Sequence, residues 1–284
     1  MVKLTSLDAT KEITFDNKSY VLNEKDLGTA AITLSTYKGN NQIGVKVSGR
    51  TLDTRDISIV GYILAEDKEE MLQKKRNLQK LVNPFEDFYL VIDKYRIQVS
   101  ASQSIEYAIA HYENNKWLCK FLIAGTCGNP CFTEINPVIV PVAYWQANFH
   151  FPLTMTEGNT VVMGVRQPAM IKMIDNVGET EIGMQIRFRA NVNDITNPYI
   201  MNLLTQEKLQ LNCTMSAGEV IEVNTNYGEK SVIQNGSTDY FYTMDLDSDF
   251  LQLHQGENYL RYGADTNEEN LEIDIEYRPQ YLEV

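Results

Sequence analysis

The stretch LEIDIEYR, residues 271–278, alternates one apolar and one charged side chain along its whole length. Successive side chains of a strand point to opposite faces of a sheet, so this period of two predicts a strand with one dry face and one wet face. The same alternation recurs at 185–189 and at 209–215. Turn residues such as Asn235-Gly236 separate these runs at short intervals. The second half of the chain is therefore predicted to be an antiparallel β-sandwich.

The first half carries strands and one helix. Residues 57–64 read ISIVGYIL and are apolar on both faces, as in a central strand of a sheet. Residues 67–70 form a capping-box-like start for a helix over 68–82, which ends before Asn83-Pro84. Lysines and one arginine cover one side of this helix and are expected to face solvent. Its apolar face is expected to hold Met71, Leu72, Leu78, Leu81 and Val82.

Charge divides the chain into two parts. Residues 1–140 hold 17 basic and 17 acidic side chains, whereas residues 141–284 hold 8 basic and 21 acidic ones and so account for the net charge of −13. This break predicts two domains, 1–140 and 141–284, joined within a segment rich in Pro and β-branched residues at 133–151. The acidic half is expected to repel nucleic acid and anionic membranes, so neither is a predicted partner. A start without an apolar core predicts folding in a cytoplasm.

Candidate chemistry is weak throughout the chain. Cys119, Cys127 and Cys131 lack the paired spacing of a zinc site, and Cys119 shares strand parity with apolar residues, which predicts a buried core thiol. Gly125-Thr-Cys127-Gly128 lacks the second glycine and the following helix of a nucleophile elbow. The acidic run 245–249 resembles a calcium loop without its glycine and its final Glu, and predicts a polar turn. We therefore expect no catalytic, cofactor or metal site, and no enzyme.

Two segments resemble a known family. Residues 57–84 are similar to the front of siphophage distal tail proteins, the ring proteins of the phage tail tip. The second half is similar to the family's N-x-G turn, N-P-x-I strand, G-E-x-I-x-V-x-T strand, L-x-x-G-x-N turn and closing Y-R-P strand. The longer, methionine-rich segment 138–175 departs from the family pattern. The positions that fall on these motifs are Asn176, Gly178, Asn197, Pro198, Gly218, Glu219, Thr225, Gly256 and Asn258.

The resemblance implies a mainly β protein with two domains. The first would be a tail-tube-like β-sandwich with one flanking helix, and the second a galectin-like antiparallel β-sandwich. The implied function is structural: a hexameric ring of identical subunits at the virion tail tip, assembled in the bacterial host cytoplasm. The tail tube protein would bind above the ring, and a hub, fibre or tail-associated lysin below it. In some family members the second domain holds receptor-binding modules.

An alternative from another class stays open at this point. The acidic sandwich could be a carbohydrate-binding adhesion module, because exposed aromatic rings stack on sugar rings. Aromatic residues in strands more often belong to the core or to cross-strand pairs. Mass in solution separates the two hypotheses, since a ring must assemble and a binding module need not. The sugar-stacking candidates are Tyr227, Tyr240, Tyr242 and Tyr259.

Overall fold

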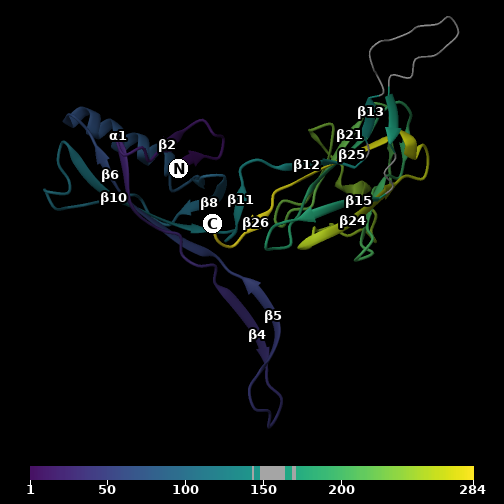
Figure 1. The fold of residues 1–284 in the computed structure, drawn as a ribbon, viewed down its shortest axis with the longest axis horizontal. Helices are drawn as coiled ribbons and strands as arrows, with labels where there is room; N and C mark the ends of the chain where they lie inside the picture. The colour runs from purple at the N-terminus through teal and green to yellow at the C-terminus, as the bar shows by residue number, and fades with distance from the viewer. Residues whose placement is uncertain (143, 148–163, 168–170) are drawn as a thin grey trace, which may run out of the picture. The chain divides into compact units, whose positions relative to one another are not determined.

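The computed structural model describes residues 1–142, 144–147, 164–167 and 171–284 (Figure 1). It divides into two compact units. Unit 1 consists of residues 1–135 together with 281–284, and unit 2 consists of residues 136–280. Much of the methionine-rich segment 138–175 lies outside the described residues, and so does part of the predicted boundary segment beyond residue 142.

Unit 1 is built on an antiparallel sheet of ten strands, with the main path β2-β1-β7-β8-β10-β6-β3. Strand β9 pairs with β10, and β11 pairs with both β8 and β26. A helix and a separate two-stranded hairpin complete the unit. The elements are β1 (Val2–Ser6), β2 (Glu12–Thr14), β3 (Tyr20–Asp26), β4 (Ile32–Tyr37), β5 (Lys46–Leu52), β6 (Arg55–Leu64), α1 (Lys68–Leu81), β7 (Phe88–Ile92), β8 (Tyr95–Ala101), β9 (Glu106–Tyr107), β10 (Leu118–Cys127), β11 (Phe132–Glu134) and β26 (Gln280–Tyr281).

Strand β6 lies inside this sheet between β10 and β3, which confirms the central strand predicted from ISIVGYIL. Its odd-numbered side chains, including Ile59 and Ile63, are buried in the core of unit 1. The even-numbered ones from Ser58 to Leu64 are only half-buried. Gly61 is required by a close approach: a Cβ there would lie 2.6 Å from the Phe121 ring.

Helix α1 begins where the capping pattern predicts. Asp67 is the N-cap residue, and its side chain accepts a hydrogen bond of 2.8 Å from the backbone N–H of Glu70. Met71, Leu78 and Leu81 are buried on the sheet side. The prediction for Leu72 was wrong: its side chain is 49% exposed. Residues 71 and 72 are neighbours, about 100° apart around a helix, so a narrow contact stripe covers only one of them.

The hairpin β4–β5 with its flanking residues, 31–53, is here called the arm. It is inserted between the adjacent strands β3 and β6, and the backbone N–H of Asp53 closes its base on the carbonyl of Ala31 at 2.8 Å. Figure 1 shows it as a two-stranded ribbon standing apart from the main sheet. Every residue of β4 is exposed, and so is every residue of β5 except Gly49.

The chain returns to unit 1 at its end. Arg55, the first residue of β6, has no exposed surface. Its guanidinium donates to the backbone carbonyl of Leu282 and, at 3.5 Å, to that of Leu27. It also lies 5.0 Å from the centroid of the Phe132 ring. Because a buried charge is stable only when its donors find acceptors, residues 281–284 complete this unit.

Unit 2 is built on two antiparallel sheets. One has the strand order β12-β25-β16-β21-β22-β23 and the other β15-β24-β18-β19, with two short pairs, β13–β14 and β17–β20, beside them. The elements are β12 (Val138–Pro141), β13 (Tyr144–Ala147), β14 (Gly164–Gln167), β15 (Ile171–Asn176), β16 (Gln185–Ala190), β17 (Ile195–Thr196), β18 (Tyr199–Asn202), β19 (Lys208–Gln210), β20 (Thr214–Met215), β21 (Val220–Asn224), β22 (Ser231–Gln234), β23 (Thr238–Asp239), η1 (Phe241–Thr243), β24 (Gly256–Gly263), η2 (Glu268–Asn270) and β25 (Leu271–Tyr277).

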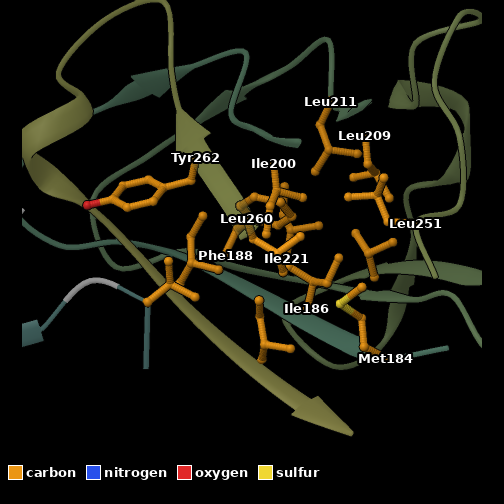
Figure 2. Packing of buried hydrophobic residues seen from close by; sticks show 14 of the residues in the cluster. Met184, Ile186, Phe188, Ile200, Leu209, Leu211, Ile221, Leu251, Leu260 and Tyr262 are labelled. Carbon is orange, nitrogen blue, oxygen red and sulfur yellow. The ribbon is translucent and has the colours of Figure 1, made fainter. Parts of the chain in front are cut away.

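The core of unit 2 follows the period of two in the sequence. Ile186 and Phe188 of β16, both labelled in Figure 2, are fully buried. They lie opposite Ile275 and Ile273 of β25, and the charged residues between them are half-buried. The opposite sheet contributes Ile200 and other apolar residues to the same cluster. The predicted mainly β fold with two parts and one α-helix is thus confirmed, whereas the galectin-like identity of the second part stays a prediction.

Candidate functional site

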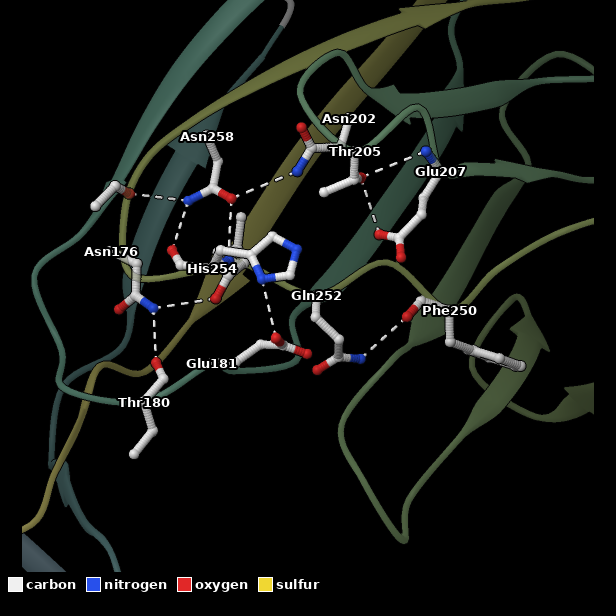
Figure 3. A network of polar contacts seen from close by, with 12 residues as sticks. Asn176, Thr180, Glu181, Asn202, Thr205, Glu207, Phe250, Gln252, His254 and Asn258 are labelled. Atoms are coloured by element: carbon white, nitrogen blue, oxygen red, sulfur yellow. Dashed lines mark hydrogen bonds and ion pairs between the residues drawn. The ribbon is translucent and has the colours of Figure 1, made fainter. Parts of the chain in front are cut away.

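Two of the family-motif residues, Asn176 and Gly178, belong to one turn of unit 2, and Figure 3 shows the side chain of Asn176. The side-chain amide of Asn176 is fully buried and donates to the carbonyls of Thr180 and Leu253, at 2.9 and 3.1 Å. Its oxygen accepts the backbone N–H of Gly178 at 3.0 Å. A Cβ on Gly178 would lie 2.8 Å from the backbone of Gln280, so no larger residue fits there. The N-x-G motif therefore fixes the conformation of this turn and packs it closely against Gln280, which follows β25.

Asn258 forms the second buried polar centre. Its side-chain oxygen accepts the backbone N–H of His254 at 3.0 Å, and its amide donates to the carbonyls of His254 and Gly256. Asn202 donates to the same oxygen at 3.4 Å. A buried amide with every bond satisfied stabilises one loop conformation, because any other conformation leaves its polar atoms unpaired. The L-x-x-G-x-N motif thus orders the loop before β24.

Four further family-motif residues lie at turns. Asn197 has a positive φ of 49° and donates to a carboxylate oxygen of Asp265 at 2.7 Å. Pro198 is buried beside it. Gly218 and Gly256 have φ values of 89° and 84°, in the left-handed region where glycine is favoured. All of these residues shape the backbone, and none of them presents a reactive group.

A small polar cluster lies at the surface near Asn258. The Nδ1 atom of His254 lies 2.9 Å from a carboxylate oxygen of Glu181, and the other oxygen of Glu181 accepts the hydroxyl of Tyr227 at 3.3 Å. All three side chains are at least partly exposed. No sequence pattern indicated this cluster, because Glu181 is remote along the chain from its two partners. The hydrogen bond to Glu181 restrains the hydroxyl end of the Tyr227 side chain.

The structure separates the four tyrosine candidates by exposure. Tyr227 is 69% exposed and Tyr242 is 78% exposed. Tyr240 is half-buried and packs edge-on against Tyr242, with ring centroids 5.1 Å apart. Tyr259 is half-buried, and its hydroxyl donates to Glu257 at 2.7 Å. Exposed ring faces are therefore offered by Tyr227 and Tyr242.

Lys230 and Phe250, which were not predicted, extend this aromatic surface together with Phe241. The Nζ atom of Lys230 lies 5.7 Å from the ring centroid of Tyr227 and 4.7 Å from that of Phe250. Phe250 in turn contacts Phe241 at 5.9 Å between centroids. Sequence reasoning missed Phe250 and Lys230, because their proximity depends on the packing of the loop 240–250 against the β21–β22 turn.

The described residues assemble no reactive or metal site. Cys119, Cys127 and Cys131 are buried, and burial raises the pKa of the Cys127 thiol to about 11, so it stays protonated and unreactive near neutral pH. Cys119 lies in the core, as its strand parity predicts. Within 1–142 and 171–284, no group of three or more His, Cys, Asp and Glu side chains is placed to hold a metal ion. No α-helix in the described part of the chain is long and apolar enough to span a membrane.

Asp245 opens the acidic run and lies in a turn, as predicted. Its carboxylate accepts the side-chain amide of Asn212 at 2.6 Å and the backbone N–H of Asp247 at 2.9 Å. These hydrogen bonds lower its pKa, with the Asn212 bond the larger cause. Each oxygen of the Asp245 carboxylate thus accepts a hydrogen bond from within unit 2.

Both units match known domains of phage tail proteins. Residues 10–123 match the phage tail protein RIFT-related domain, and residues 177–281 match the C-terminal domain of the siphovirus-type tail component. The two matches fall in the two units and together cover most of the chain. The chain thus carries two domains that are characteristic of siphovirus-type phage tail proteins.

Solved structures share this fold over nearly their whole length. The crystal structure of the Dit protein of phage SPP1, described as a paradigm of the hub adsorption apparatus in phages infecting Gram-positive bacteria, has a TM-score of 0.68 at 11% identity, over 98% of this chain and 99% of that one. A chain of the phage P2 baseplate, in its activated conformation with Ca, has a TM-score of 0.52 at 12% identity, over 97% of this chain and 97% of that one. The same baseplate with Sr gives the same values. No curated protein sequence matches the chain.

Proposed function

We propose that this chain forms a hexameric ring at the tail tip, which joins the tail tube to the hub, fibre or tail-associated lysin below. The observation that carries this proposal is the presence of both tail-component domains in one chain whose fold matches a hub protein from end to end. A connector needs two different surfaces, one for the tube and one for the hub, and two separately folded units can supply them. Assembly would take place in the host cytoplasm.

The ring would close through the first domain, residues 1–140, with the second domain, 141–284, outside it. A ring of identical subunits uses a heterologous interface, in which one patch meets a different patch on the neighbour. The first domain is electrically balanced, whereas six acidic second domains packed side by side would repel one another. A ring wall without a basic stripe would also let DNA pass without binding it.

The chemistry of the described residues supports a scaffold without catalytic activity. Turn glycines and buried asparagines occupy the family-motif positions, and the Cys127 thiol stays protonated. An enzyme would need an acid, base or nucleophile held within reach of a substrate in a cleft. We therefore assign the family-motif residues to the folding of unit 2, and the function of the chain to the surfaces by which it contacts other tail proteins.

Native mass spectrometry and electron microscopy of the purified full chain test the ring. We expect a species with six copies and six-fold symmetric particles with a central opening. Adding the purified tail tube protein of the same phage should produce stacked complexes. A chain that remains monomeric at high concentration, or that closes into a dimer, would contradict the proposal.

A second candidate function is glycan binding by unit 2, and the exposure of Tyr227 and Tyr242 favours it. Their ring faces could stack on sugar rings of a bacterial surface polysaccharide. Titration with host cell-wall polysaccharide, followed by NMR, should shift signals of both rings. Tyr227→Ala with Tyr242→Ala should abolish binding, while Tyr259→Ala, which removes a half-buried ring, serves as the control. Unchanged spectra would leave unit 2 as a holder for other tail proteins.

A further inference from the structure

The two faces of the arm differ sharply in polarity. Strands β4 and β5 pair antiparallel, so directly opposite residues share a face. Ile32 lies opposite Leu52, and Leu34 lies opposite Arg50; these residues, with Val47 beyond the bulge, define the apolar face of the arm. The opposite, polar face carries the pairs Thr33–Thr51, Ser35–Gly49 and Tyr37–Lys46. One apolar face and one polar face are typical of a strand pair whose apolar face packs against another part of a protein.

Within the described residues, nothing covers this apolar face. Ile32 is 59% exposed, Leu34 51%, and Val47 and Leu52 are each 40% exposed. Near the tip, Ile43 is fully exposed and Val45 is 57% exposed. An isolated two-stranded hairpin is at best marginally stable in water, so the arm needs a partner to hold its conformation.

The exposed apolar area is large enough for the centre of an interface. Large apolar side chains offer roughly 150–200 Å² each, so the four aliphatic residues of the apolar face expose on the order of 300 Å², and Ile43 and Val45 near the tip add nearly as much. A standard interface buries about 800 Å² per partner, and apolar patches of several hundred Å² often mark interaction sites. The arm could thus supply the apolar part of one side of an interface.

Charge identifies the partner. Residues 31–53 hold three basic side chains, Lys38, Lys46 and Arg50, and one acidic side chain, whereas the rest of the chain holds 22 basic and 37 acidic ones. This remainder of the chain is here called the body, and most of its acidic excess lies in residues 141–284, which hold 8 basic and 21 acidic side chains. The second domain of a neighbouring copy therefore offers the arm an acidic surface. Complementary charge favours attraction between the arm of one copy and the body of the next.

We propose that the arm docks through its apolar face on the body of a second copy of this chain. The contact is heterologous, because a protruding ribbon meets a surface of a different kind, and such contacts close into rings. The proposal rests on the proposed ring and names the element that links neighbouring subunits. Its binding energy comes from burial of the aliphatic residues, and the basic residues orient the approach.

Two matched double variants test this on the full chain. Ile32→Asp with Leu34→Asp places two charges on the apolar face. Ser35→Asp with Thr51→Asp places the same two charges on the polar face of the same hairpin. Burial of two aliphatic side chains predicts a rise of at least roughly 100-fold in the dissociation concentration of the first variant. The second should stay within a few-fold of the unmodified chain. Hydrogen exchange in β6 and β10 checks that unit 1 remains folded.

Mixing provides a second readout. An apolar-face variant still has the body surface that accepts an arm, but its own arm no longer docks. An excess of this variant should therefore bind unmodified subunits, stop further addition and convert rings into short oligomers. Analytical ultracentrifugation of the mixture measures this. An unmodified chain that is monomeric overturns the ring and the docking together. If the unmodified chain assembles, then normal assembly of the apolar-face variant, or equal loss in both variants, overturns the docking and leaves the ring intact. Normal assembly with loss of tail tube binding would place the arm on that protein instead.

Discussion

Ending the chain after Gln280 should destabilise unit 1, although the deletion lies far along the sequence from β6. It removes the Leu282 carbonyl that accepts from the buried Arg55 guanidinium. It also removes Tyr281, whose ring packs edge-on against Tyr95 at 5.2 Å between centroids. The hydrogen bond to a charged donor contributes about 1.5–3 kcal/mol and the aromatic pair about 0.5–1.5 kcal/mol, so the expected loss is about 2–5 kcal/mol.

Hydrogen-exchange mass spectrometry measures this loss in unit 1 separately from unit 2. We expect reduced protection of β6 and β11 in the shortened chain, with unit 2 unchanged. The first thermal transition should fall by on the order of 10 °C, taking a few degrees per kcal/mol for a domain of this size. Arg55→Met in the shortened chain should recover part of the stability, since it removes the unpaired buried charge.

Glu283→Gln in the full chain is the matched control. Glu283 lies 3.9 Å from the Arg55 guanidinium but is 67% exposed, so this ion pair should contribute no more than a few tenths of a kcal/mol. Equal protection of β6 in the shortened and full chains would refute the reasoning. A loss in Glu283→Gln as large as in the deletion would assign the effect to the exposed carboxylate and not to the buried carbonyl.

Three further predictions concern single positions. Gly178→Ala should lower the free energy of unfolding of unit 2 by more than about 2 kcal/mol in a urea melt, because its Cβ would lie 2.8 Å from backbone atoms of Gln280. Gly128→Ala, whose Cβ would have no atom within 4 Å, should leave the melt almost unchanged. Asn258→Leu should cost about 2–4 kcal/mol by the same melt, since it leaves backbone groups of the His254 loop unpaired; an unchanged midpoint would contradict this. Cys127, with a pKa raised to about 11, is uncharged below that pH, so it should resist thiol reagents at pH 8 until urea unfolds unit 1; rapid labelling of the folded chain would refute its burial.

The strands of unit 2 were predictable because the alternation of apolar and charged residues that defines each strand lies within the strand itself. In β25, Leu271, Ile273 and Ile275 are buried at every second position, and the charged residues between them are half-buried. The alternation in the sequence therefore indicates which side chains face the core. The helix start at Asp67 is equally local, since its cap bond spans three residues. Leu72 was misplaced because the width of a buried stripe depends on the surface that it contacts.

The features with the greatest functional interest were not predictable from local pattern. The segments 32–37 and 46–52 favour strands, but no pattern in them says that nothing covers their apolar side chains. Arg55 looks like a solvated strand end until the chain returns to bury it. The aromatic surface around Phe250 depends on loops that meet only in the folded unit. Contacts between residues remote in sequence determine each of these features.

The return of residues 281–284 to unit 1 also sets an order of events on the ribosome. Residues 136–280 must be synthesised after most of unit 1 and before its last strand, which at about 5–20 residues per second takes on the order of 10 s. During that interval Arg55 lacks the Leu282 acceptor and β11 lacks one neighbour. A nascent chain therefore cannot complete the unit that carries the arm. Unit 1 can reach its full stability only after translation has passed residue 282.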